Sequence, residues 1–106
     1  MNFTRVTNLV VQDIHLLDPA NHFVRVTDCS RVRIERVTMT APHTSPNTDG
    51  INFEGGEDQL LRNCTISNGD DCVSIIVSGP GASSSGKSPA PDQAPACLGY
   101  ILTDCL

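Results

Sequence analysis

The chain has 106 residues, which is room for one small domain and excludes a large multidomain enzyme. Seven basic residues against twelve acidic ones give a formal net charge of -5, and no cluster of Lys and Arg marks a nucleic-acid surface. No apolar run approaches the roughly 20 residues that a membrane span needs, and the first residues do not form a secretory signal peptide. The composition therefore predicts a soluble protein with no nucleic-acid or membrane partner.

Short strand patterns rich in Val, Ile and Leu follow one another along residues 1–76, and no helical pattern of useful length interrupts them. They fall into two types that alternate along the chain. The first type spans residues 9–16, 32–39 and 59–66, and the second spans residues 22–26, 49–53 and 71–75. Both types recur after 22 to 27 residues, so they share one period.

A repeat of this length, built from short strands with polar corners, is typical of one coil of a parallel β-helix. We therefore predict an all-β protein, a partial right-handed parallel β-helix of about three coils, with equivalent residues about 4.8 Å apart in successive coils. A small antiparallel sandwich or barrel is the alternative, because it also uses short strands. The β-helix is favoured because whole pairs of strands align. Since about three coils bury little and leave strand edges unpaired, we expect a piece of a longer protein.

The composition changes near residue 77. Residues 78–96 consist mainly of Gly, Pro, Ser and Ala, with almost no side chain to bury. We therefore divide the chain into a partial β-helix at residues 1–76 and a Ser/Pro/Gly-rich tail at residues 77–106, and we expect the tail to be disordered and foreign to the fold.

Five cysteines in a chain of this length favour an oxidising compartment. No pair has the spacing of a zinc site, so we expect no metal, and we interpret Cys64 as a small buried hydrophobic residue. Asn2 and Asn63 each begin an N-x-T sequon, and we predict Asn63 as a glycosylation site of a secreted protein. These features predict a secreted, extracellular parent protein, although this chain begins without a signal peptide.

Three carboxylates fall at corresponding places of the repeat. Asp49 lies 22 residues before Asp71, and Asp70 adjoins Asp71. Their side chains should leave the same face of successive coils, where mutual repulsion would keep one of them protonated at mildly acidic pH. A carboxylic acid near a carboxylate that activates water is the arrangement that hydrolyses a glycosidic bond. Ordinary turns and a calcium site are the alternatives, because Asn, Asp and Gly favour corners and Asp oxygens suit calcium.

Two segments, SPNTDG at residues 45–50 and ISNGDDCVSI at residues 66–75, resemble the polygalacturonase family of glycoside hydrolases, which carries N-T-D and G-D-D motifs on a right-handed parallel β-helix. The resemblance covers about residues 3–76. It implies that Asp70 is the general acid and that Asp49 and Asp71 position and activate water. The implied reaction is inverting hydrolysis of α-1,4-galacturonosyl bonds. The implied partner is a polysaccharide, pectin or polygalacturonate, bound by a monomer without a cofactor.

Two further residues are predicted to bind substrate. His22 occupies the repeat position of Asp49 one coil earlier, and Asn47 matches the first residue of the N-T-D motif. The alternatives are a solvated surface position for His22 and a purely structural corner role for Asn47.

The family also carries G-H-G and R-x-K motifs, whose cations hold the substrate carboxylate. Neither motif follows Asp71, and the cation after it is Lys87. We therefore expect a truncated enzyme with little or no activity. The alternative is a non-catalytic protein that binds pectin or oligogalacturonides, or acts as a decoy.

Overall fold

The computed structural model describes the backbone of residues 1–76 and 97–103 and the side chains of residues 1–76. Every regular element in these residues is a β-strand, and none of them forms a helix that could cross a membrane. One parallel sheet, sheet A, contains β1 (Asn2–Thr4), β3 (Val24–Thr27), β5 (Ile51–Glu54) and β8 (Val73–Ile76). The other, sheet B, contains β2 (Thr7–Leu17), β4 (Ser30–Thr40), β6 (Gly56–Arg62) and β9 (Cys97–Thr103), and β7 (Thr65–Ser67) also pairs with β4.

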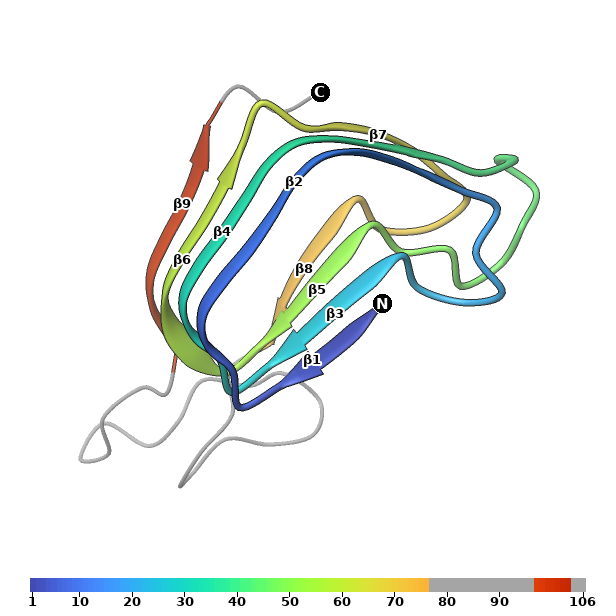
Figure 1. The fold of residues 1–106 in the computed structure, drawn as a ribbon. Helices are drawn as coiled ribbons and strands as arrows, with labels where there is room; N and C mark the ends of the chain where they lie inside the picture. The colour runs from blue at the N-terminus through green and yellow to red at the C-terminus, as the bar shows by residue number, and fades with distance from the viewer. Residues whose placement is uncertain (77–96, 104–106) are drawn as a thin grey trace.

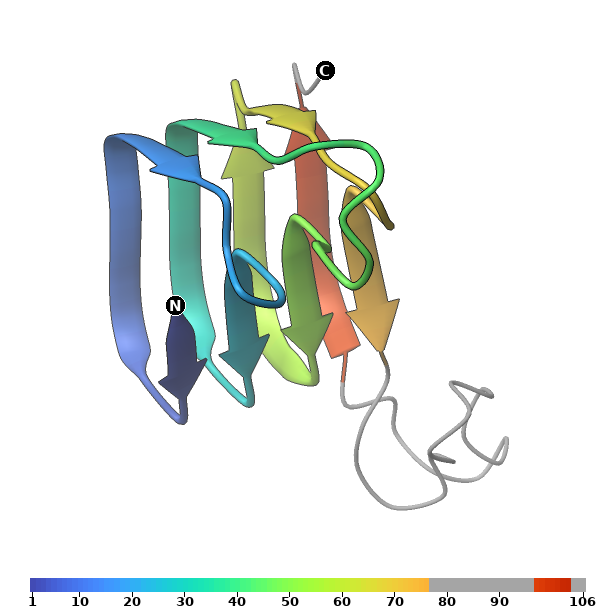
Figure 2. The ribbon, with the colours of Figure 1, turned by 90° about the vertical axis from the view of Figure 1, so that its right-hand side faces the viewer.

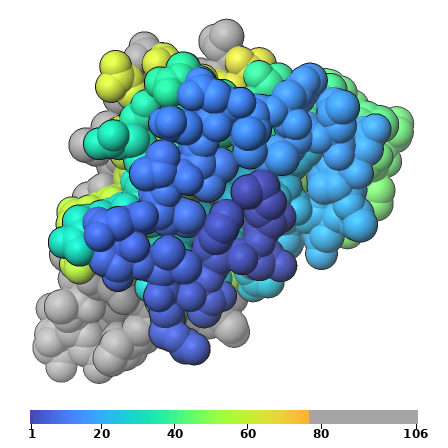
Figure 3. Space-filling model, in the orientation of Figure 1, coloured from blue at the N-terminus to red at the C-terminus, as the bar shows by residue number. Residues whose placement is uncertain are grey.

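The two sheets face each other, and the chain passes from sheet A to sheet B and back in each coil (Figure 1). Figure 2 shows the strands of each sheet lying side by side as the coils stack. The first coil, blue in Figure 3, covers the middle of one face of this stack. All the strand pairs of both sheets are parallel. The protein is therefore a parallel β-solenoid of about three turns, which confirms the predicted fold class and excludes the antiparallel alternative.

The strand register follows the repeat found in the sequence. Leu9 pairs with Val32, which pairs in turn with Gln59, as the first strand pattern predicts. In sheet A, the successive partners of Asn2 are Arg25, Asn52 and Ser74, which gives coils of 23, 27 and 22 residues. Residues at such equivalent positions form a column that runs along the stack.

The core lies between the two sheets, where inward side chains of successive coils pack against one another. Its largest fully buried apolar side chains come from β4, β5 and β6: Phe53, Ile34, Met39, Ile51 and Leu61. Two buried thiols complete this core, and each donates a hydrogen bond to the carbonyl two residues before it, Cys29 at 3.4 Å and Cys64 at 3.3 Å. The prediction that Cys64 is a small buried residue is confirmed.

Sharp corners join sheet A to sheet B. The first residue of each corner has a left-handed backbone conformation: φ is 52° at Arg5, 51° at Asp28 and 67° at Gly55. Their N–H groups continue the ladder of sheet A, since each donates to the carbonyl of the last strand residue in the next coil. A left-handed residue changes the chain direction within one residue, so this column makes the same sharp corner in every coil.

Residues 97–103 form β9, which pairs with β6 from Gly56 to Arg62. The expectation of a disordered tail therefore does not hold for these residues. The physical reason is the sequence CLGYILT, which is rich in strand-forming side chains and sets Tyr100 in register beside Gln59. The other residues of the predicted tail, 77–96 and 104–106, lie outside the described part of the chain.

Candidate active site

The predicted carboxylates lie on the wide loops that return the chain from sheet B to sheet A. Asp49 comes two residues before β5 and Asp71 two residues before β8, and the first residues of these strands, Ile51 and Val73, are register partners. The N–H of Gly50 donates to the carbonyl of Asp71 at 2.9 Å, which holds the two backbones side by side. Asp49 and Asp71 therefore occupy equivalent positions of successive coils.

Two glycines let the loops approach this closely. A Cβ atom on Gly50 would lie 2.3 Å from the carbonyl oxygen of Cys72, and one on Gly69 would lie 2.1 Å from the carbonyl oxygen of Ser45. Both distances are far shorter than a van der Waals contact. The glycines of the two motif segments are thus required by backbone packing between neighbouring loops.

Buried polar side chains tie the same two loops together. Thr48 is 2% exposed, and its hydroxyl donates to the carbonyl of Ser45 and accepts from the N–H of Gly69, both at 2.9 Å. The Asn68 amide donates to the carbonyls of Thr48 and Asp71 at 2.7 and 3.0 Å. The motifs therefore include the corner chemistry that the turn interpretation predicts, and this chemistry fixes the loops from which the carboxylates project.

Asp70 is exposed and is held by two backbone groups. One carboxylate oxygen accepts from the N–H of Asp71 at 2.9 Å, and the other accepts from the N–H of Asn47 at 3.3 Å. Asn47 has a left-handed φ of 57°, as a corner role requires, and its side chain is exposed. The exposed Asp71 carboxylate accepts one hydrogen bond, from the Ser74 hydroxyl at 3.4 Å. Asp70 and Asp71 are therefore open to a ligand from the outside.

Asp49 is less exposed and has different neighbours. Its side chain is 14% exposed, with Oδ1 3.4 Å from Nδ1 of His22 and Oδ2 accepting from the Asn52 amide at 3.2 Å. The sequence repeat predicts that His22 lies beside Asp49. It does not predict that Asn52 is a neighbour of Asp49, because the strand pattern gives Asn52 an ordinary outward position. Its signal was the spacing of three residues after Asp49, the same as that of Ser74 after Asp71.

Within residues 1–76, no group of three or more His, Cys, Asp or Glu side chains is arranged to hold a metal ion. The calcium interpretation of the acidic segments therefore gains no support from the arrangement of these side chains.

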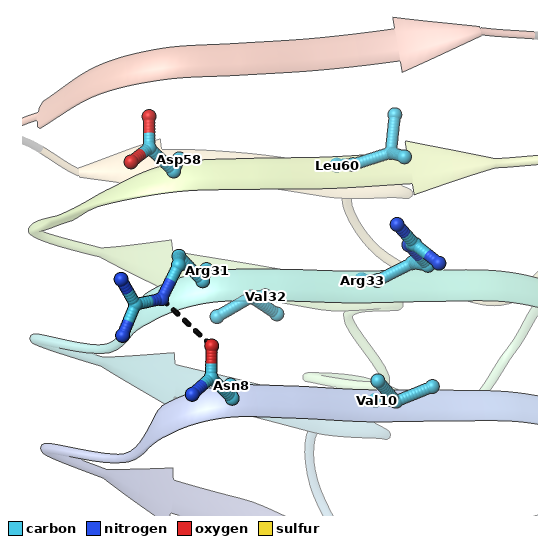
Figure 4. Close-up of a pocket in the computed structure, with 7 residues that line it drawn as sticks. All are labelled: Asn8, Val10, Arg31, Val32, Arg33, Asp58 and Leu60. Carbon is cyan, nitrogen blue, oxygen red and sulfur yellow. Dashed lines mark hydrogen bonds between the residues drawn. The ribbon is translucent and has the colours of Figure 1, made fainter.

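A separate groove of about 470 Å³ lies on the outer face of sheet B and includes none of the predicted site residues (Figure 4). It is lined by side chains of β2, β4 and β6: Asn8, Val10, Arg31, Val32, Arg33, Asp58 and Leu60. Arg31 donates to the Asn8 side chain at 2.7 Å, and Nε of Arg33 lies 3.3 Å from a carboxylate oxygen of Glu35. Both cations of the groove already have partners in the protein.

The sequence profile described as glycosyl hydrolases family 28 matches residues 1–83. The chain belongs to glycosyl hydrolases family 28. Among its relatives in the family, polygalacturonases of Malus domestica and Medicago sativa are 37% and 41% identical to it over 76 and 73 residues, or 72% and 69% of this chain. A polygalacturonase of Nicotiana tabacum is 30% identical over an alignment 118 residues long, which covers 99% of this chain. The resemblance to polygalacturonases is thereby confirmed. No solved structure matches the chain.

The family 28 chain spans 16%, 17% and 30% of the lengths of these Malus, Medicago and Nicotiana relatives. The Nicotiana match also includes residues after 76, so similarity to the family is not confined to the part that the two motifs occupy.

Proposed function

We propose that the chain carries the acidic centre of an inverting glycoside hydrolase that cleaves α-1,4-galacturonosyl bonds in pectin or polygalacturonate. The observation that carries the proposal is the placement of Asp49 and Asp71 at equivalent positions of successive coils, with Asp70 next to Asp71 and held by the N–H of Asn47 from the loop of Asp49. Membership of family 28 supports glycoside hydrolysis, and the names of the polygalacturonase relatives support the substrate class.

In the proposed reaction, Asp70 donates a proton to the leaving glycosidic oxygen while Asp49 and Asp71 hold a water molecule and accept its proton. The water attacks the anomeric carbon from the side opposite to the leaving oxygen, so the configuration inverts. Asp70 suits the acid role because it is exposed and its carboxylate is oriented by two backbone N–H groups. Asp49 suits the water-holding role because its carboxylate is fixed by neighbours and only partly exposed.

Asn47 and His22 are proposed substrate contacts close to these carboxylates. The exposed Asn47 side chain lies in the loop whose backbone holds Asp70, and His22 stands one coil before Asp49 in the same column. A sugar chain that crosses successive coils would meet both. We also propose a secreted monomer that meets its polysaccharide outside the cell, with glycosylation at Asn63, which is exposed.

Release of reducing ends from polygalacturonate tests the proposed reaction. The Asp70→Asn variant keeps the size of the side chain but removes the acid, so we expect the rate to fall by at least about a hundredfold. Asp58→Asn is a matched control, because Asp58 is an exposed acid on sheet B and its replacement changes the net charge equally. Equal rates for the wild type and Asp70→Asn would show that Asp70 has no catalytic role.

Non-catalytic binding of oligogalacturonides is the second candidate, and it uses the same exposed loop face around Asn47 and Asp70. Calorimetric titration with a defined oligogalacturonide separates the two functions. Heat of binding at millimolar ligand without any bond cleavage would favour the binding protein. Heat of binding together with cleavage that Asp70→Asn abolishes would favour the enzyme.

A further inference from the structure

His22 presents a buried ring nitrogen to Asp49. Its Nδ1 atom is buried and lies 3.4 Å from Oδ1 of Asp49, within range of an ion pair, but it makes no hydrogen bond. The His22 side chain is 26% exposed, and this exposed surface belongs to other atoms of the side chain. A buried polar nitrogen without a partner is unfavourable, and the Asp49 carboxylate is the acceptor placed beside it.

The other two histidines of the chain use their rings differently. Nε2 of His15 lies 3.1 Å from the Thr40 hydroxyl, and Nε2 of His43 lies 3.1 Å from the Ser67 hydroxyl. Both rings are exposed and meet neutral groups of the next coil. Among the three histidines of the sequence, His22 is the one whose Nδ1 faces a carboxylate. Its environment is therefore distinct from that of an ordinary surface histidine.

Asn52 completes the surroundings of the same carboxylate. Its side chain is 4% exposed, and its amide nitrogen donates to Oδ2 of Asp49 at 3.2 Å. The two oxygens of Asp49 thus each face one polar group, His22 from the preceding coil and Asn52 from the same coil. Asp71, at the equivalent position of the next coil, accepts from the Ser74 hydroxyl alone among the side chains of residues 1–76.

We propose that His22 and Asn52 are positioning residues that fix the Asp49 carboxylate between them. His22 donates its Nδ1–H to Oδ1 and Asn52 donates its Nδ2–H to Oδ2, so the carboxylate presents its remaining lone pairs in one direction. The first bond shortens when substrate binds, because catalytic hydrogen bonds in unliganded sites are often long and tighten in the complex. This inference rests on the proposed function, in which Asp49 holds the attacking water.

The proposal determines which nitrogen of His22 carries the proton. A neutral imidazole has one N–H, so donation from Nδ1 leaves Nε2 unprotonated. Nε2 then remains available as an acceptor for a sugar hydroxyl, which is compatible with the substrate contact proposed for His22. The tautomer can be measured whether or not the protein cleaves any substrate.

Nitrogen-15 NMR of the imidazole rings of the full chain tests the tautomer, at a pH where the rings are neutral. We expect the Nδ1–H form for His22 in the wild type and the Nε2–H form in Asp49→Ala. His15 and His43 should keep their signals in both proteins, which verifies that the variant is folded. If the variant does not fold, the wild-type spectrum alone decides, and an Nε2–H form of His22 there overturns the proposal.

Kinetics with two replacements of His22 tests the positioning role. Asn places its amide near the position of Nδ1, whereas Gln reaches the position of Nε2. We expect His22→Gln to lower kcat by about a hundredfold, beyond any change in KM from the lost substrate contact, and His22→Asn to restore most of the loss in kcat. His15→Asn is the control for replacing a histidine elsewhere.

Equal kcat values for His22→Asn and His22→Gln, or a change confined to KM, would contradict positioning and favour a structural role or a plain substrate contact. If the wild type itself releases no reducing ends, the proposed function fails, and the imidazole spectrum alone decides whether His22 and Asp49 are paired.

Discussion

The sharp corners and the wide loops of this solenoid differ in how much they vary. The sharp corners are the same length in the three coils, since Thr4, Thr27 and Glu54 are register partners and so are the residues three positions later. The wide loops differ in length. Measured between equivalent register positions, they run from residue 16 to 24 in the first coil, from 39 to 51 in the second and from 66 to 73 in the third. All of the variation in coil length is therefore in the wide loops.

This difference separates two tasks within one coil. The sharp corners set the register of both sheets through left-handed residues that recur in a column. The wide loops carry Asp49, Asp70 and Asp71 and are held by polar contacts between neighbouring loops. Damage to a sharp corner should therefore reduce the stability of the whole stack, whereas damage to a wide loop should mainly disturb the site.

The largest effect is expected at Gly56, in a sharp corner. Gly56 has a φ of 85°, and a Cβ atom there would lie 2.2 Å from the carbonyl oxygen of Cys29. Gly56→Ala combines backbone strain with a clash against backbone, so we expect a loss of at least about 3 kcal/mol in the free energy of unfolding. Gly69→Ala, in a wide loop, also places a Cβ against a backbone carbonyl but adds no strain from a positive φ, so we expect a smaller loss of about 2 kcal/mol. Equilibrium urea denaturation measures both, and equal losses would contradict the separation of tasks.

A smaller effect is expected at Thr48, within a wide loop. Thr48→Val keeps the shape of the side chain but removes the hydroxyl that joins the Ser45 carbonyl to the Gly69 N–H. We expect a loss of about 1 to 3 kcal/mol in the free energy of unfolding, because buried polar groups lose their partner. Thr44→Val is the control, since Thr44 is exposed in the same loop and its replacement should stay within about 0.5 kcal/mol. Similar losses for the two variants would show that the Thr48 hydroxyl does not hold the loop.

The smallest effect is expected at the Asp13–Arg36 pair on the outside of sheet B. Arg36 donates to both carboxylate oxygens of Asp13, at 2.5 and 3.0 Å, and this hydrogen bonding lowers the pKa of Asp13 in the folded protein. The contribution of the pair to stability is therefore complete above the pKa of Asp13 in the unfolded chain. It is lost as the pH falls through the lower pKa of the folded state.

Melting temperatures of the wild type and Asp13→Asn across the acidic range measure this contribution. We expect a small difference near neutral pH that shrinks as the pH falls and as salt is added, because both side chains are exposed. A difference that is independent of pH and salt would mean that the ion pair is not its source.

Much of this fold is predictable because inward positions must be apolar in every coil. Val24, Ile51 and Val73, which are register partners in successive coils, show this directly. The alternation of apolar residues predicts that they point inward, and the shared repeat predicts that they pair with one another. Gln59 is an instructive exception. It stands at an apolar position of the repeat and is 1% exposed, with its amide donating to the carbonyls of Cys29 and Gly55. The sequence periodicity predicts the inward position of Gln59, but it does not predict the hydrogen bonds that Gln59 makes at the corner.

Other features depend on information that the sequence pattern does not carry. Arg31 has a left-handed φ of 54°, although Arg is not a typical turn residue. The position of Arg31 in the stack of coils imposes that conformation, and its side chain donates a hydrogen bond to Asn8. The strand at residues 97–103 was missed because residues 77–96 interrupt the period. Likewise, the repeat placed His22 beside Asp49, but the approach of their side chains depends on rotamers that periodicity does not determine.

The unequal wide loops have an evolutionary consequence. Coils of 23, 27 and 22 residues share one strand register, so this fold accommodates added or removed residues along a single edge without a change in strand pairing. Such changes remodel the edge that carries the acids and leave the inherited stack of strands in place. A lineage built on this architecture can diversify what it recognises without having to find a new way to fold.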